Sequence, residues 1–282
     1  MALDQLKSVF TYRFTHDNEQ PLPVAASEWA AALAVQAGAH LGAIMATQHH
    51  NVSNIMGASL VSNVVGDQNR KLAASATERA NTLQAAAQAA GVDSSVSTLS
   101  ATYPDIRSTL VSCARLYDLV VADAAPDASS MQRELLVDMI FHSARPTIVI
   151  PTSATTPNLN HVVVGWDGTA PAARALADAM PLLRAAKSVD VVNVMGDKDL
   201  PETARAASLV KHLLRHGIAA QAREIALNGG DAGQTLLHHA VSTQAGLLVM
   251  GAYAHSRFRQ MVFGGVTSAL LKDCPIPLLM SH

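Results

Sequence analysis

The second half of the chain alternates short apolar runs with longer segments whose apolar residues recur at helical spacing. The apolar runs predict buried strands at 161–165, 188–195, 220–227, 246–250 and 275–280. The helical spacing predicts helices over 170–186, 202–217 and 231–244, with a short helix before the last strand. Strands that alternate with helices in this way indicate a parallel sheet with helices on both faces.

The first half repeats this order less clearly. Its patterns predict strands at 8–14, 39–47, 92–99, 116–122 and 145–151, and helices at 24–38, 69–91, 105–115 and 130–144. The segment DLVVADAA begins at residue 118 and GLLVMGAY at residue 246, 128 residues later. RPTIVI precedes CPIPLL by 129 residues. This near-constant spacing predicts an internal duplication.

Length and the junction between the halves predict two domains. A chain of 282 residues is longer than most single cores, which seldom grow beyond about 250 residues. Residues 151–160, PTSATTPNLN, have the composition of a linker. We therefore predict an α/β protein with two doubly wound parallel-sheet domains in tandem, 1–151 and 160–282. Their C-terminal strands, in PTIVIP and PIPLLM, are expected to pair, since both edges would otherwise be exposed.

Composition narrows the class of partner. The net charge is −2 and the pI about 6.6, so no basic field attracts nucleic acid or an anionic membrane. Only two cysteines occur, Cys113 and Cys274, which is too few for a disulfide framework or a CxxC zinc pattern. No segment reaches eighteen uncharged apolar residues, and the N-terminus has no signal-peptide pattern. These features predict a cytoplasmic protein.

One loop carries the candidate chemistry. In MGAYAHSRFRQMVFGGVT, residues 250–267, a glycine follows a predicted strand and a glycine pair opens a predicted helix. Free N–H groups at the start of a helix, together with the helix dipole, can hold a phosphate without a lysine. The pattern therefore favours a phosphate-binding loop.

The second half resembles a universal stress protein domain, with its adenine nucleotide alpha hydrolase-like fold. The resemblance rests on VVVGWDGTAPAARAL (162–176), VVNVM (191–195) and the segment from 247 to 282, and it extends only diffusely over the first half. The family's motif is a glycine, two residues, a glycine, nine residues, and a glycine followed by Ser or Thr. Gly251 and Gly264 match its first and third glycines. The whole chain is similar in size to the tandem members of the family.

The resemblance implies an adenine nucleotide as ligand, with ATP first and with or without Mg²⁺. It assigns Asp167 to the ribose or a metal-bridged phosphate, Val194 to adenine, Met250 and Gly251 to the ribose, and the amides of Gly264, Gly265 and Val266 to phosphate. It implies a sensing or regulatory role in stress response. No general base is evident, so we expect at most slow ATP hydrolysis. Two alternatives stay open, a protein-interaction module that binds no nucleotide and a slow adenine-nucleotide hydrolase.

The loop departs from the family motif at two positions. Ala254 replaces the second glycine, and its methyl group costs about 1 kcal/mol if that position needs positive φ. Gly265 replaces the Ser or Thr, and Thr267 lies two residues further on. Asp167 has an alternative role as a helix cap in WDGTAP.

The first half departs further. Asp123 falls at the position of Gly251, Pro126 falls at that of Ala254, and RELLVD replaces FGGVT. A carboxylate repels phosphate and a proline removes an amide donor, so this half is not expected to bind a nucleotide. Its expected role is to pair with the second half, and a homodimer of the chain is a further possibility.

Other polar patterns have simpler explanations. His212 and His216 are four residues apart on a predicted helix, a spacing that can chelate zinc, yet basic residues near a helix end also satisfy the dipole. The pairs His49–His50 and His238–His239 are adjacent, so their side chains diverge. Arg257 and Arg259 flank the glycine loop and could reach anions, or simply be solvated.

Overall fold

The fold is built from two consecutive sets of strands and helices. The computed structural model describes residues 3–16, 24–49, 59–127, 129–196, 200–227, 232–252, 254–255, 262–263, 270–271 and 274–282. The first set comprises β1 (Ser8–Thr15), α1 (Ala25–Ala37), β2 (His40–Gln48), α2 (Ser59–Ala89), β3 (Ser94–Ala101), α3 (Tyr103–Ala114), β4 (Leu119–Asp123), α4 (Met131–His142) and β5 (Thr147–Ile150). The second comprises β6 (His161–Gly165), α5 (Ala170–Ala185), β7 (Ser188–Met195), η1 (Glu202–Ala204), α6 (Ala206–Arg215), β8 (Ala220–Ala226), α7 (Ala232–Ser242), β9 (Leu247–Gly251), β10 (Ala254–His255), β11 (Val262–Phe263) and β12 (Leu278–Ser281).

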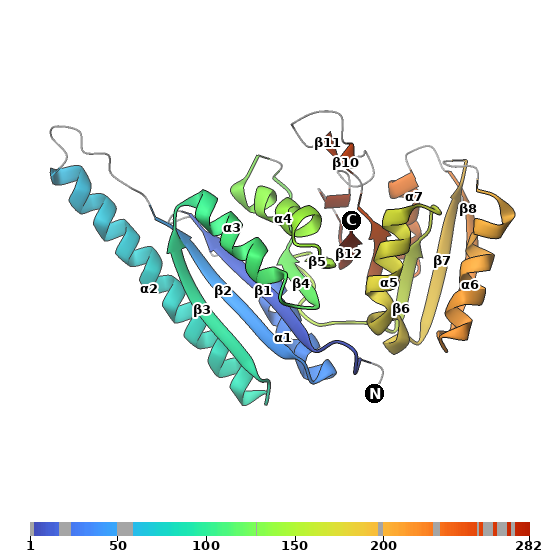
Figure 1. The fold of residues 1–282 in the computed structure, drawn as a ribbon, viewed down its shortest axis with the longest axis horizontal. Coiled ribbons are helices and arrows are strands. Elements are labelled where there is room, and N and C mark those ends of the chain that lie inside the picture. The colour runs from blue at the N-terminus through green and yellow to red at the C-terminus, as the bar shows by residue number, and fades with distance from the viewer. Residues whose placement is uncertain are drawn as a thin grey trace.

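Ten of the strands form one continuous sheet, in the order β3-β2-β1-β4-β5-β12-β9-β6-β7-β8. Within each set the neighbouring strands are parallel, as βαβ connections require. The two sets meet where β5 and β12 pair antiparallel, with Val149 opposite Leu278 and Thr147 opposite Met280 (Figure 1). These are the strands at which the sequence predicts that the halves meet. The structure is therefore α/β, as predicted, with a large and mostly parallel sheet.

Apolar layers cover both faces of the sheet. One layer receives residues from α1, α5 and α6, and α2 packs beside it on β2. The other layer receives residues from α3, α4 and α7. Strands covered on both faces become continuous apolar runs, which explains why β6 and β7 begin and end at the residues predicted from the sequence.

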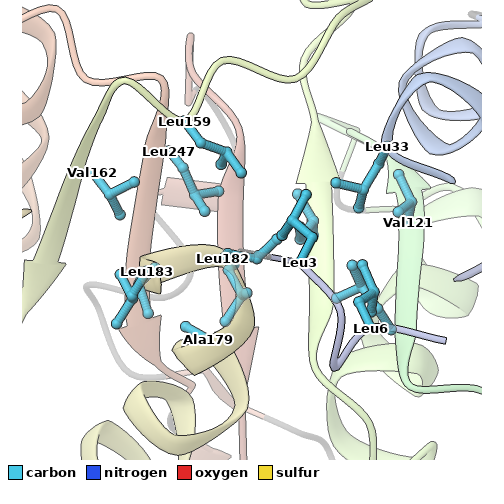
Figure 2. Close-up of a cluster of buried hydrophobic side chains, with 14 of the residues drawn as sticks. Leu3, Leu6, Leu33, Val121, Leu159, Val162, Ala179, Leu182, Leu183 and Leu247 are labelled. Atoms are coloured by element: carbon cyan, nitrogen blue, oxygen red, sulfur yellow. The ribbon is translucent and has the colours of Figure 1, made fainter. Parts of the chain in front are cut away.

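The N-terminal segment joins the two halves. Leu3 and Leu6 are 6% and 4% exposed and belong to the same apolar cluster as Leu182 of α5. Figure 2 shows Leu3 between Leu182 on one side and Leu33 and Val121 of the first half on the other, with Leu6 on the side of Leu33 and Val121. The core of the protein is thus continuous across the junction.

Two helices differ from their predicted bounds. α2 begins at Ser59, ten residues before the predicted start at 69, and its early turn leaves Val64 65% exposed. An apolar residue so exposed does not belong to the core-facing side on which the prediction depended. The helix predicted over 202–217 is divided into η1 and α6, because Arg205 is extended with ψ 169°. Over the described residues, no helix is long and apolar enough to cross a bilayer.

Candidate functional site

The candidate site lies where the winding of the second half reverses. In the sheet, β6 lies between β7 and β9. The chain leaves β6 through α5 on one face and returns to β9 through α7 on the other. β6 and β9 pair from Val162–Leu247 to Val164–Val249, and each strand continues beyond its last paired residue. Ligands of open α/β sheets bind at such a switch point, at the carboxyl ends of the strands.

Asp167 follows β6 and shapes the turn that starts α5. Its Oδ1 accepts hydrogen bonds from the backbone N–H of Thr169 at 3.2 Å and from the Thr169 hydroxyl at 2.5 Å. Thr169 is the N-cap of α5, and its Oγ1 accepts from the N–H of Ala172 at 3.5 Å. Gly168, between them, has φ 72°, a conformation that favours glycine. Asp167 therefore supports the helix cap without being the cap itself.

Gly251 ends β9 directly beneath the first turn of α5. A Cβ at this position would lie 2.5 Å from the N of Ala172 and 2.6 Å from the carbonyl C of Pro171. The residue pairs with Ser281 in β12 and has no positive φ. The glycine is required because the helix approaches the strand so closely, not because of its backbone conformation. This contact brings the N-terminus of α5 to the strand end.

Val194 and Met250 lie at the ends of the two strands that flank β6. The Val194 side chain is half-buried and packs on the apolar layer beneath α7. Met250 is 5% exposed, with its side chain in the same layer. Contact between Met250 and a ribose would therefore use its main chain. Asp167, Val194, Met250 and Gly251 thus come together at three neighbouring strand ends.

The glycine loop itself is described only in part. Ala254 lies in β10 and pairs antiparallel with Phe263 of β11. Gly264, Gly265, Val266 and Thr267 lie outside the described residues, as do Arg257 and Arg259. Figure 1 shows β10 and β11 next to each other beyond the end of the main sheet.

Asn193 also organises these strand ends, although the sequence analysis did not single it out. It is 3% exposed and projects from β7 on the opposite face to Val194. Its amide donates to the carbonyl of Trp166, and its Oδ1 accepts from the N–H of Ala206 at the start of α6. The side chain ties the β6–α5 turn to the next helix. The sequence sign of this role is a polar amide side chain inside the otherwise apolar run VVNVM.

A second missed group surrounds Asp190, in the same strand but near its amino end. Its Oδ2 lies 3.1 Å from Nε2 of His239, 3.3 Å from Nε of Arg223 and 3.8 Å from Nε2 of His161, and Gln221 donates to Oδ1 at 2.7 Å. Burial alone would raise the pKa of Asp190, but the hydrogen bonds from Gln221 and His239, with the charge of Arg223, hold it below the usual value.

The histidines form no metal site in the part of the chain that the structure describes, where no group of three His, Cys, Asp or Glu residues has suitable geometry. The rings of His212 and His216 are 4.7 Å apart in an edge-to-face arrangement. Nδ1 of His216 lies 3.5 Å from Nη2 of Arg184, a cation that would repel a metal.

In the first half, the residue at the position of Gly251 is engaged with a helix. Asp123 ends β4, and its Oδ1 accepts a hydrogen bond from the N–H of Ala26 in α1 at 2.9 Å. Burial raises the pKa of Asp123 to about 6, although the hydrogen bond from Ala26 and the charge of Arg13 lower it. A carboxylate thus occupies this strand end.

The order of elements and the switch point between β6 and β9 define a doubly wound α/β domain. Residues 158–282 match the model of the universal stress protein family, and this half of the chain is a domain of that family.

Solved structures extend the likeness to the whole chain. A universal stress protein from Archaeoglobus fulgidus aligns with a TM-score of 0.71 at 14% identity, over 97% of this chain and 98% of that one. A putative universal stress protein from Pseudomonas aeruginosa aligns at 0.57 and 14% identity, over 100% and 95%. A protein of unknown function from the same species gives 0.57 and 14%, over 99% and 94%. At such identity these likenesses show the fold alone. A search of curated proteins gave no match.

Proposed function

We propose that the second half binds an adenine nucleotide, with ATP as the first candidate, and that the chain is a stress-response protein in which this ligand has a sensing or regulatory role. The observation that supports the proposal is the convergence of Asp167, Val194 and Gly251 at the switch point of a universal stress protein domain. A cytoplasmic location fits this role, and neither Cys113 nor Cys274 is part of a disulfide.

The first turn of α5 gives the proposed site a partial positive charge. Because Gly251 has no side chain, this helix start comes within contact distance of the strand end. The N-terminus of a helix carries a partial positive charge, which favours a nearby anion. Asp167 would accept hydrogen bonds from ribose hydroxyls or face a phosphate-bound Mg²⁺. Gly264, Gly265 and Val266 would supply amides to the phosphates, beside Thr267. We assign no general base and expect at most slow hydrolysis.

The test is calorimetric titration of the full chain with ATP and Mg²⁺, after native mass spectrometry for co-purified nucleotide. Asp167→Asn keeps an oxygen for Thr169 and should preserve the turn, whereas Asp167→Ala removes both the turn and the ligand contact. We expect affinity to fall in both variants and thermal stability to fall mainly in the second. Asp93→Asn, at a side chain 88% exposed in the first half, is the matched control. No bound nucleotide and no heat from the parent protein would reject the proposal.

The pairing of β10 with β11 supports one alternative, in which the loop is a surface for a partner protein. The loop backbone at Ala254 is extended and paired with Phe263, an arrangement that uses main-chain groups otherwise available to phosphate. Ala254→Gly separates the two readings. If the parent has no affinity for ATP and the glycine variant gains it, the interaction-module function is favoured for the natural chain.

We also propose that the halves stay paired through β5 and β12 in solution. This pairing covers two strand edges that would otherwise be exposed.

A further inference from the structure

The strand ends at Asp123 and Gly251 are equivalent places in the two halves. β4 lies beside β1 in the register Val9–Leu119, and β9 lies beside β6 in the register Val162–Leu247. Asp123 and Gly251 each stand four residues beyond the second member of that pair. The spatial equivalence therefore agrees with the 128-residue offset in the sequence.

Each of the two strand ends contacts the first turn of a helix, α1 at Asp123 and α5 at Gly251, but in opposite ways. In the second half, Gly251 has no side chain, and the first turn of α5 fills the space where a Cβ would be. That helix is capped by its own Thr169. In the first half, α1 begins after Val24, whose side chain makes no capping hydrogen bond. The Asp123 carboxylate supplies the missing acceptor from 97 residues away, at 2.9 Å from the N–H of Ala26.

The contact has the composition of a bound anion at a helix N-terminus. The carboxylate accepts a backbone N–H in the first turn of α1, where the helix dipole is positive. Arg13 of β1 attracts it, and Glu28 of α1 repels it. The charge of Asp123 also acts on Tyr12 of β1. An external carboxylate or phosphate in place of Asp123 would find the same N–H group, helix dipole and Arg13 guanidinium, opposed by Glu28 and by burial.

We propose that Asp123 is an internal anion, which occupies the helix-N-terminal anion site of the first half and closes it to carboxylates and phosphates from solution. The inference goes beyond nucleotide binding and does not depend on it, because every residue involved belongs to the first half. It changes the role of the aspartate from a charge that merely repels phosphate to a tethered ligand that replaces it.

The test is chemical rescue. Asp123→Ala removes a carboxylate group and leaves its Cβ, so the space vacated at Ala26 matches formate. At pH 7.5, the midpoint of thermal unfolding of the full chain is measured against sodium formate, with sodium chloride at the same ionic strength as reference. We expect a saturating rise specific to formate, about 2–4 °C when formate exceeds its dissociation constant about tenfold. Acetate, with its extra methyl group, should give a smaller rise.

The controls are the parent protein and Asp123→Asn. The asparagine keeps an oxygen for the N–H of Ala26, so neither protein should respond to formate beyond the chloride reference. Equal responses in all three proteins, or no formate-specific rise in Asp123→Ala, would overturn the proposal. If the alanine variant does not fold, Asp123→Ser serves in its place, because its shorter side chain also leaves room for formate. A formate-specific rise in the serine variant would then support the proposal, and no such rise would overturn it.

Discussion

Replacing Asp123 with asparagine should change how the stability of the protein depends on pH. In the folded state burial raises the pKa of Asp123 from 3.8 to about 6, against the opposing effects of Ala26 and Arg13. A carboxyl group with a raised pKa favours folding while it is protonated. Its contribution is therefore complete below the unfolded-state value and is lost as pH rises from about 4 through about 6. Asparagine cannot ionise and has no such loss.

The size of the effect follows from the shift. A change of about two pKa units corresponds to about 3 kcal/mol of unfolding free energy, and residual solvation of this half-buried group makes that an upper figure. The free energy of unfolding of Asp123→Asn minus that of the parent should therefore rise by up to about 3 kcal/mol between pH 4 and pH 7. Below pH 4 the difference should be constant.

Urea denaturation at half-unit intervals of pH, followed by circular dichroism, measures this difference. Glu78→Gln, at an exposed side chain of α2, should give a difference that barely changes over the same range. A flat or falling difference for Asp123→Asn would show that the carboxylate is not desolvated at the end of β4. The reasoning about its environment would then be wrong.

Two further substitutions test the packing and the charge cluster. Gly251→Ala should cost about 1–3 kcal/mol in denaturant titrations, because its Cβ would lie 2.5 Å from the N of Ala172. Gly66→Ala, in the interior of α2 with only a side-chain atom 3.9 Å away, should instead stabilise by about 0.5–1 kcal/mol, and equal effects at the two glycines would contradict the packing argument. Although burial opposes them, hydrogen bonds from Gln221 and His239 and the charge of Arg223 lower the pKa of Asp190. These contacts therefore stabilise the fold above pH 4 and are lost as pH falls below that value, so Asp190→Asn should flatten the acid limb of the stability curve. An unchanged acid limb would show that the cluster around Asp190 does not control it.

Most of the fold could be predicted from the sequence because the strands are buried on both faces. Burial on both faces produces apolar runs, and their ends mark the ends of β6 and β7 to the residue. The early turns of α2 could not be predicted in the same way, since Val64 there is 65% exposed and is not part of the core. The break before α6 lies at the extended Arg205, and the N–H of Ala206 next to it donates to Asn193 of β7, a tertiary contact that no local pattern encodes.

The candidate site could be predicted from the sequence less completely than the fold. Asp167 and Gly251 were identified through the resemblance to a family, because spacing alone does not distinguish a nucleotide loop from an ordinary turn. The reason for the glycine, contact with Pro171 and Ala172, is tertiary and appears in no local pattern. The partners of Asp190 come from β6, β8 and α7, so the sequence showed only an isolated charge in an apolar strand.

The structure shows how the start of α1 can be satisfied at the end of β4 without an external ligand. A helix N-terminus at a strand end must have its N–H groups satisfied, whether by a ligand, by its own cap or by a side chain from elsewhere. α5 uses Thr169 and comes close to Gly251, which leaves its anion-attracting end at the strand ends. α1 lacks such a cap and receives Asp123 instead. A single carboxylate thus satisfies the helix and replaces the anion, so the first half can serve the pairing of β5 with β12 without any bound molecule.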